Sequence, residues 1–237
     1  MIDEKIKLIH FGNDCASGIV INDILKIGEK QLFQLGLYDF DDILYYLKEE
    51  KYEEIYNKSY LFLNDIKIDK FYSVSKNYTT FTDDDKSVSN KKYNFKFNHD
   101  YEVKNNEIIN YDFIVSSFDE KIENFKKCLE LENKIIFITF TNHDVKVSEM
   151  IDILKKKTNN WFRLVIFTSN KNLKYCVDQV ELIYLDNEYY RSWFLKNLKD
   201  RFFLYEEIYN KLHNLLKSYI DLPVFEDTHY YKTIDRI

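Results

Sequence analysis

The 237-residue sequence predicts an α/β fold, built on a mostly parallel, Rossmann-like sheet with helices on both faces. Short apolar runs that are typical of buried strands alternate with amphipathic helical patterns, and this alternation favours parallel strands joined by crossover helices. The sequence contains only 4 glycines and 1 proline, fewer than turn-rich all-β proteins need. A chain of this length also buries enough surface to fold without disulfides or a structural metal.

The N-terminal elements are predicted from three patterns. Residues 5–11 form a short run with apolar side chains on both alternating faces, as expected for a strand that is covered on two sides. Residues 16–27 carry apolar side chains at helical spacing, with Asp14 as a candidate N-cap and Gly28 as the stop. Residues 41–55 show the same spacing and predict a second helix.

The middle of the chain is less regular. Residues 83–86 are charged and indicate a solvated turn, whereas aromatic residues alternate with polar ones over 93–97 and predict a half-buried strand. Apolar residues at helical spacing over 118–129 predict an amphipathic helix. Because no linker or internal repeat is present, we expect one domain over 1–237, with 59–111 as a candidate inserted lobe.

The C-terminal half has the clearest alternation. Buried strands are expected over 134–140, 162–167 and 180–185, with a helix from 147 to 154 between the first two. A long helical pattern rich in aromatic residues follows over 190–219. The alternative architecture is papain-like α+β, in which a helical lobe packs against an antiparallel barrel.

Composition argues against several classes of function. The chain has 40 acidic and 34 basic residues, and its formal charge of −6 argues against a nucleic-acid-binding protein. No run approaches the roughly 18 apolar residues of a membrane span, and the charged N-terminus lacks an apolar signal-peptide core. The 3 widely spaced cysteines form neither a disulfide framework nor a zinc pattern, and no glycine-rich phosphate loop occurs. We therefore expect a cytoplasmic protein with no metal, cofactor, nucleic acid or membrane as its partner.

Polar residues follow three of the predicted strands, and in an open parallel sheet such ends share one edge. The segments are 12–15, 141–144 and 168–170. If the three strands are neighbours, Cys15, His143 and Ser169 surround one site. His143 is therefore a candidate for contacting substrate.

Cys15 is the candidate nucleophile. It follows a strand and a glycine at the predicted start of a helix, where backbone N–H groups and the helix dipole lower the pKa of a thiol. The N–H groups from Gly12 to Asp14, together with the Asn13 amide, are candidates for holding an oxyanion or substrate. The alternative is that Cys15 is a small buried residue at a helix–sheet junction. The other two cysteines are interpreted as packing residues: Cys128 and Cys176.

A cysteine nucleophile needs a base, which is usually a histidine. Three histidines lie in polar segments and are candidates for this role: His99, His143 and His229. His10 lies within the first predicted strand and is interpreted as structural. His213 lies on the long C-terminal helix and is interpreted as solvated.

The motifs resemble a family of uncharacterised bacterial and viral proteins described as papain-like cysteine peptidases. The first strand leads into a Gly-x-x-Cys element at residues 12–15. Residues 38–40 (Tyr-Asp-Phe) resemble the family's aromatic-Asp-aromatic element, with 40–42 as a competing alignment. Residues 99–101 (His-Asp-Tyr) resemble its His-Asp-aromatic element. The order and rough spacing of these elements agree over about residues 6–170.

The resemblance implies a cysteine-dependent hydrolase. In this reading Cys15 is the nucleophile, His99 is the general base and Asp39 orients His99. The implied substrate is a peptide, an amide or a glycan-linked acyl group. The chain departs from the family at two points, because Phe40 stands where the family has tryptophan and the arginine that ends a later strand is absent.

Two other functions remain open. One is an α/β enzyme of another class, either a sugar-handling transferase or an esterase-like hydrolase. In the esterase-like case Cys15 replaces the serine nucleophile, and Glu226 and His229 near the end of the chain complete the site. A binding protein with an inert site fits the aromatic content of 17% and the two departures from the family. Loss of turnover in His229→Ala rather than in His99→Ala would favour the esterase-like enzyme. Unchanged biological activity of Cys15→Ala would favour the binding protein.

Overall fold

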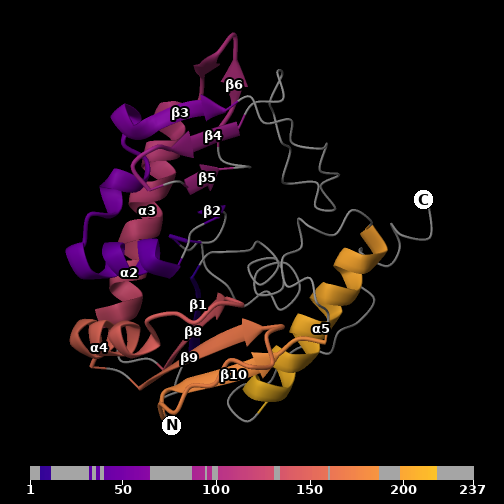
Figure 1. Cartoon of the computed structure of the whole chain (residues 1–237). Helices are drawn as coiled ribbons and strands as arrows, with labels where there is room; N and C mark the ends of the chain where they lie inside the picture. The colour runs from indigo at the N-terminus through magenta and orange to yellow at the C-terminus, as the bar shows by residue number, and fades with distance from the viewer. Residues whose placement is uncertain are drawn as a thin grey trace.

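The computed structural model describes residues 6–11, 32–33, 36–37, 40–64, 87–93, 95–97, 101–130, 134–159, 161–186 and 198–217 (Figure 1). Four of its strands form a parallel sheet: β1 (Ile6–His10), β8 (Lys134–Phe140), β9 (Phe162–Thr168) and β10 (Val180–Tyr184). Their order in the sheet is β1-β8-β9-β10, and each neighbouring pair is parallel. The sheet confirms the predicted α/β class and the four predicted strands.

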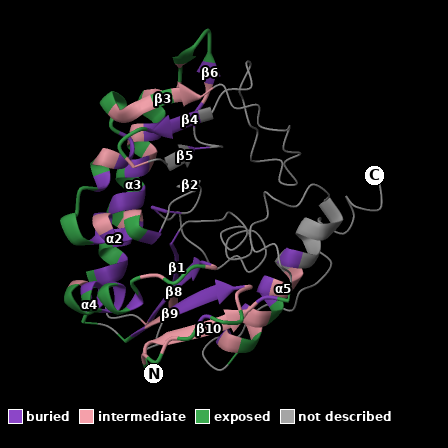
Figure 2. Cartoon of the chain, in the orientation of Figure 1, coloured by how far each residue is buried: buried purple, intermediate pink, exposed green. Residues whose placement is uncertain are grey.

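Helices cover both faces of this sheet: α2 (Phe40–Glu49), α3 (Tyr111–Glu130) and α4 (Val147–Lys157) on one face, and α5 (Leu198–Leu216) on the other. The side chains of β8 alternate between the two. Ile135 and Phe137 belong to the hydrophobic cluster with α2, α3 and α4, whereas Ile136 and Ile138 belong to the cluster with α5. Burial is concentrated in β8 and β9 and on the inner sides of the helices, whereas β10 is intermediate along its whole length (Figure 2).

The burial of β8 follows directly from its sequence. After Lys134 it has no charged side chain, and every residue from Ile135 to Phe140 is buried. Phe137 stacks on Phe11 with ring centroids 4.9 Å apart, which joins β8 to the end of β1. Burying one such aromatic side chain contributes about 1.5–3 kcal/mol, so these strands supply a large part of the stability.

A second, antiparallel sheet has the order β2-β5-β4-β3. Its strands, and those of a separate hairpin, are β2 (Gly36–Leu37), β3 (Leu61–Asn64), β4 (Ser87–Asn90), β5 (Phe95–Phe97), β6 (Val103–Lys104) and β7 (Glu107–Ile108). Strands β3 to β7 fall within the candidate lobe of 59–111. However, β2 precedes that range and pairs with β5, so the second sheet extends beyond it. The division of the chain into a core and a lobe stays a prediction.

Two helix boundaries differ from those predicted. The helix expected over 41–55 ends at Glu49, and a separate 3-10 helix, η2, covers Tyr52–Ile55. Glu50 adopts a left-handed φ of 57°, which stops the α-helix without a glycine. The helix expected over 118–129 begins earlier, at Tyr111. Its apolar stripe extends into these first turns, where Ile114 is buried and Tyr111 and Val115 pack against the same core.

Several predicted elements cannot be compared with the structure. The helix expected over 16–27 and the turn at 83–86 lie outside the described residues. Among the helices of the described residues, none combines the length and apolarity that crossing a membrane requires.

Candidate functional site

The carboxyl ends of the parallel strands form one edge of the sheet, and the chain leaves β1 there at Phe11. Phe11 extends the ladder, because its N–H donates to the carbonyl of Ile138 at 2.7 Å. The hydroxyl of Thr139, which is fully buried, donates to the carbonyl of Phe11 at 3.1 Å. Phe11, the last described residue before residue 12, therefore lies beside the end of β8.

The segment after β8 is fixed by its own side chains. Thr141 continues the ladder toward β9, with its N–H on the carbonyl of Phe167 at 3.1 Å. The Thr141 hydroxyl accepts the N–H of His143 at 3.1 Å and donates to the carbonyl of the same residue at 3.2 Å. His143 is exposed, so a well-fixed backbone presents its side chain to solvent.

Asn142 joins the ends of β8 and β9. Its Oδ1 accepts the Thr168 hydroxyl at 2.9 Å and the Ser169 N–H at 2.8 Å, while its Nδ2 donates to the Ser169 hydroxyl at 2.6 Å. The Asn170 amide returns a bond to the carbonyl of Asn142 at 2.9 Å. His143 and Ser169, which the sequence placed at one edge, therefore follow neighbouring strands that one polar network holds together.

A tyrosine fixes the far end of the same segment. The hydroxyl oxygen of Tyr175 accepts the N–H of Val145 at 3.1 Å. Burial, with a smaller contribution from the nearby Asp144 carboxylate, raises the pKa of Tyr175 above its ordinary value. The neutral phenol is thus the stable form, and residues 141–145 are held at both ends.

Most predicted site residues lie outside the described residues: Gly12, Asn13, Asp14, Cys15, Asp39, His99 and His229. Of the predicted site, the structure describes His143. The proposed pairing of Cys15 with His99 and Asp39 therefore stays a prediction. What the structure does give is the end of β1, beside β8, from which the chain continues to Cys15.

The remaining histidines and cysteines follow the predictions in part. His10 is buried within β1, and burial lowers its pKa to about 3, so the prediction of a structural histidine is confirmed. Cys128 is a buried packing residue, as predicted. The same prediction for Cys176 is wrong, because Cys176 is exposed in the segment between β9 and β10. His213 is half-buried rather than solvated, with its ring 5.6 Å from that of Tyr209.

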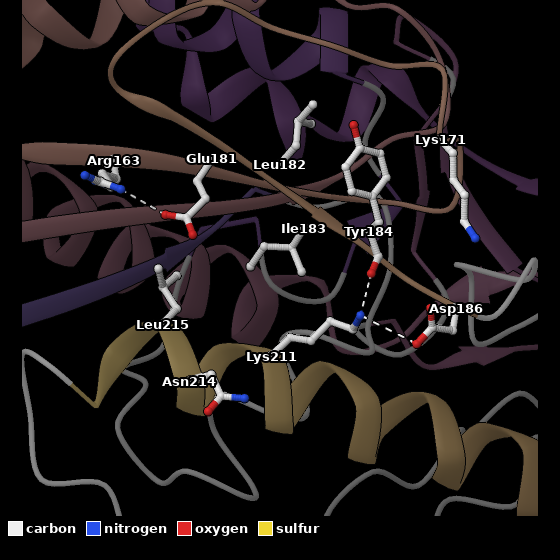
Figure 3. A pocket seen from close by; sticks show the side chains of 10 residues that line it. All are labelled: Arg163, Lys171, Glu181, Leu182, Ile183, Tyr184, Asp186, Lys211, Asn214 and Leu215. Carbon is white, nitrogen blue, oxygen red and sulfur yellow. Dashed lines mark hydrogen bonds and ion pairs between the residues drawn. The ribbon is translucent and has the colours of Figure 1, made fainter.

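A groove lies beside β10, between this strand and α5 (Figure 3). Its volume is about 940 Å³. Arg163 and Glu181 form an ion pair of 3.0 Å at one end. At the other end Lys211 donates to the carbonyl of Tyr184 at 2.5 Å and lies 3.7 Å from Asp186. Sequence reasoning missed this groove, although single charged residues within two apolar strands, at positions 163 and 181, were a signal for it.

The chain has no match among family models, curated proteins or solved structures. Within the residues that the structure covers, no three histidine, cysteine or acidic side chains gather as the ligands of a metal would.

Proposed function

We propose that the chain is a cysteine-dependent hydrolase that acts at the carboxyl edge of its parallel sheet. Cys15 attacks a substrate carbonyl, His99 accepts the thiol proton and Asp39 orients His99. The sulfur–carbon bond forms as the amine or alcohol leaves with the proton from His99. Water then adds to the acyl carbon, with its proton passing to His99, and releases the carboxylic acid and the thiol.

The observation that carries this proposal is the contact between Thr139 and Phe11. It supports a common edge for two polar segments, one that continues from β1 to Cys15 and one that carries His143 after β8. In open α/β sheets, binding sites gather at this edge. The N–H groups of residues 12–14 and the exposed His143 are the groups that we assign to oxyanion and substrate binding.

Alkylation of the three cysteines tests the proposal, since the structure supplies two internal standards. Cys128 is buried and Cys176 is exposed. We expect iodoacetamide at pH 6 to modify Cys15 about tenfold faster than Cys176, because an activated thiol is ionised at this pH. Cys128 should be protected, and intact-mass and peptide mapping would give all three rates. Equal rates at Cys15 and Cys176, or protection of Cys15, would contradict the proposal.

A hydrolysis assay separates the alternatives. If Cys15 is activated, hydrolysis of model esters and amides by wild type and Cys15→Ala should differ in rate. If Cys15→Ala retains the biological activity, the chain is a binding protein and the hydrolase proposal is wrong.

A further inference from the structure

Strand β10 is the outer edge of the parallel sheet within the described residues, because it pairs with β9 alone. The N–H of Leu185 donates to the carbonyl of Thr168 at 2.7 Å, and the carbonyl of Gln179 accepts the N–H of Leu164 at 2.8 Å. In a parallel strand the direction of these groups alternates with each residue. Residues 181 and 183 therefore turn toward β9, and the N–H and C=O groups of Leu182 and Tyr184 turn outward.

A contact from α5 shows the same direction. The ammonium of Lys211 donates to the outward carbonyl of Tyr184, where the N–H of an added strand would otherwise lie. Lys211 is itself held 3.4 Å from Glu207, one turn earlier on α5. This contact occupies the carbonyl of Tyr184, the last outward carbonyl of the strand. The N–H and C=O of Leu182 and the N–H of Tyr184 face the groove.

The groove provides room beside this edge. It is a shallow, open groove with a volume of about 940 Å³. Ile183 and Leu215 line it and pack against the cluster under α5, so they offer an apolar surface (Figure 3). A ligand that matches it has alternating backbone donors and acceptors and an apolar side chain.

The charges of the groove indicate the rest of the ligand. Two of the three lining cations are neutralised, Arg163 by Glu181 and Lys211 by Asp186. Lys171 also lines the groove and forms no ion pair with any described residue. Lys211 also faces Glu207, so the groove has little net charge, but the ammonium of Lys171 is left to pair with an acidic side chain of a ligand.

We infer that the outer edge of β10 binds an extended acidic peptide by strand addition. The peptide backbone pairs with Leu182 and with the N–H of Tyr184, an apolar side chain lies on Ile183 and Leu215, and a carboxylate lies near Lys171. Main-chain hydrogen bonds provide the affinity in this mode of binding, and the side-chain contacts provide the selectivity. The groove lies at the edge of the sheet opposite β1, and the inference does not rest on the proposed hydrolysis.

A matched pair of peptides tests the inference on the full chain. The probe is a fluorescein-labelled hexapeptide of alternating valine and threonine that ends in two aspartates, and its partner has N-methylated valines. Fluorescence anisotropy should show saturable binding of the probe, and about tenfold weaker binding of the N-methylated peptide, which lacks the backbone donors. No saturable binding of the probe, or equal binding of both peptides, would overturn the inference.

Two variants locate the site. Leu182→Pro removes an outward N–H and leaves the ladder with β9 intact, a change that edge strands accept. It should abolish probe binding while the circular dichroism spectrum stays as in wild type, and loss of the Leu182 packing should lower the melting temperature. Lys171→Glu should weaken binding several-fold without affecting the fold, whereas Lys174→Glu, an exposed change outside the groove, should not. Equal effects of the two lysine variants would contradict the assignment of Lys171.

Light scattering separates a peptide from a second copy of the chain as the occupant. We expect wild type and Leu182→Pro to have the same oligomeric state, because the edge of β10 does not pair with a second copy. A dimer that Leu182→Pro dissociates would show that the edge pairs with another copy, and would overturn the peptide assignment.

Discussion

Asn142 and Ser169 make two reciprocal hydrogen bonds across the ends of neighbouring parallel strands. The Asn142 amide donates to the Ser169 hydroxyl at 2.6 Å, and the Ser169 N–H donates to the amide oxygen at 2.8 Å. Both ends of one side chain are therefore satisfied by one residue that lies 27 positions later. This pair fixes the segment that presents His143 relative to the end of β9.

Removing this pair should destabilise the protein. Asn142→Ala leaves the hydroxyl of Thr168 and the N–H of Ser169 without their acceptor, so we expect a loss of about 1–3 kcal/mol in the free energy of unfolding. Urea denaturation measures it. Asn172→Ala, an exposed change nearby, should stay within about 0.5 kcal/mol of wild type. If both variants unfold alike, the network contributes little.

Stability should fall in mild acid because of His10. Its pKa is about 3 in the folded protein and about 6.5 in the unfolded chain, so only the unfolded chain gains this proton between those values. Proton uptake by the unfolded state lowers the free energy of unfolding as pH drops below about 6.5, by up to about 1.4 kcal/mol per pH unit, until the effect levels off near pH 3.

His10→Gln isolates this contribution. Urea denaturation of wild type and variant at pH 7 and pH 5 gives two differences in the free energy of unfolding. We expect wild type to lose about 1–2 kcal/mol more than the variant over this interval. The same pH dependence in both proteins would show that His10 is not the group responsible.

The core of the parallel sheet should be sensitive to truncation. Phe137 is fully buried against Phe11, so Phe137→Ala should cost about 3–5 kcal/mol, measured by urea denaturation. Phe113→Ala is the matched control, because Phe113 is 72% exposed, and it should change stability by less than about 0.5 kcal/mol. A small effect at Phe137 would argue against the packing between β1 and β8.

The contact between α5 and β10 should also contribute to stability. Lys211→Met keeps the apolar part of the side chain but removes the donor to the carbonyl of Tyr184, and we expect a loss of about 1 kcal/mol. Lys217→Met, at an exposed position beyond the helix, is the control. Thermal melting that moves equally in both variants would mean that loss of charge, not of this contact, is responsible.

The histidine that accepts the proton of Cys15 can be identified through thiol reactivity. If His99 has this role, His99→Gln should slow alkylation of Cys15 at pH 6 by about tenfold or more, because the thiol returns toward its ordinary pKa of about 8.5. His143→Gln and His229→Gln should keep most of the reactivity. A loss confined to His229→Gln would instead favour the esterase-like alternative.

Periodicity predicted the parts of the fold that burial determines. The strand from Lys134 to Phe140 and the helix that begins at Val147 were evident because their apolar residues repeat at the spacing of a strand and of a helix. That helix continues to Lys157, three residues beyond the predicted end at 154. Helix ends were less evident. The left-handed Glu50 ends α2 at a residue type that does not usually mark a stop.

The candidate site was predictable only as a set of strand ends. Contacts such as that between Asn142 and Ser169, or between Lys211 and Tyr184, join segments far apart in the sequence. They depend on the order of the strands in the sheet, and the spacing of residues along the sequence does not predict that order. The groove beside β10 was missed for this reason, since its two sides come from a strand and from a helix that follows after position 197.

Neighbouring side chains of β8 pack into the two helical layers that cover opposite faces of the parallel sheet. Ile136 packs beneath α5, whereas Phe137 packs beneath α2, α3 and α4. Loss of either helical layer exposes one face of β8. The exposed strand then becomes less ordered, which weakens the packing of the helices on its other face. Fluorescence and circular dichroism should therefore report a single, all-or-none denaturation, in which neither layer outlasts the other.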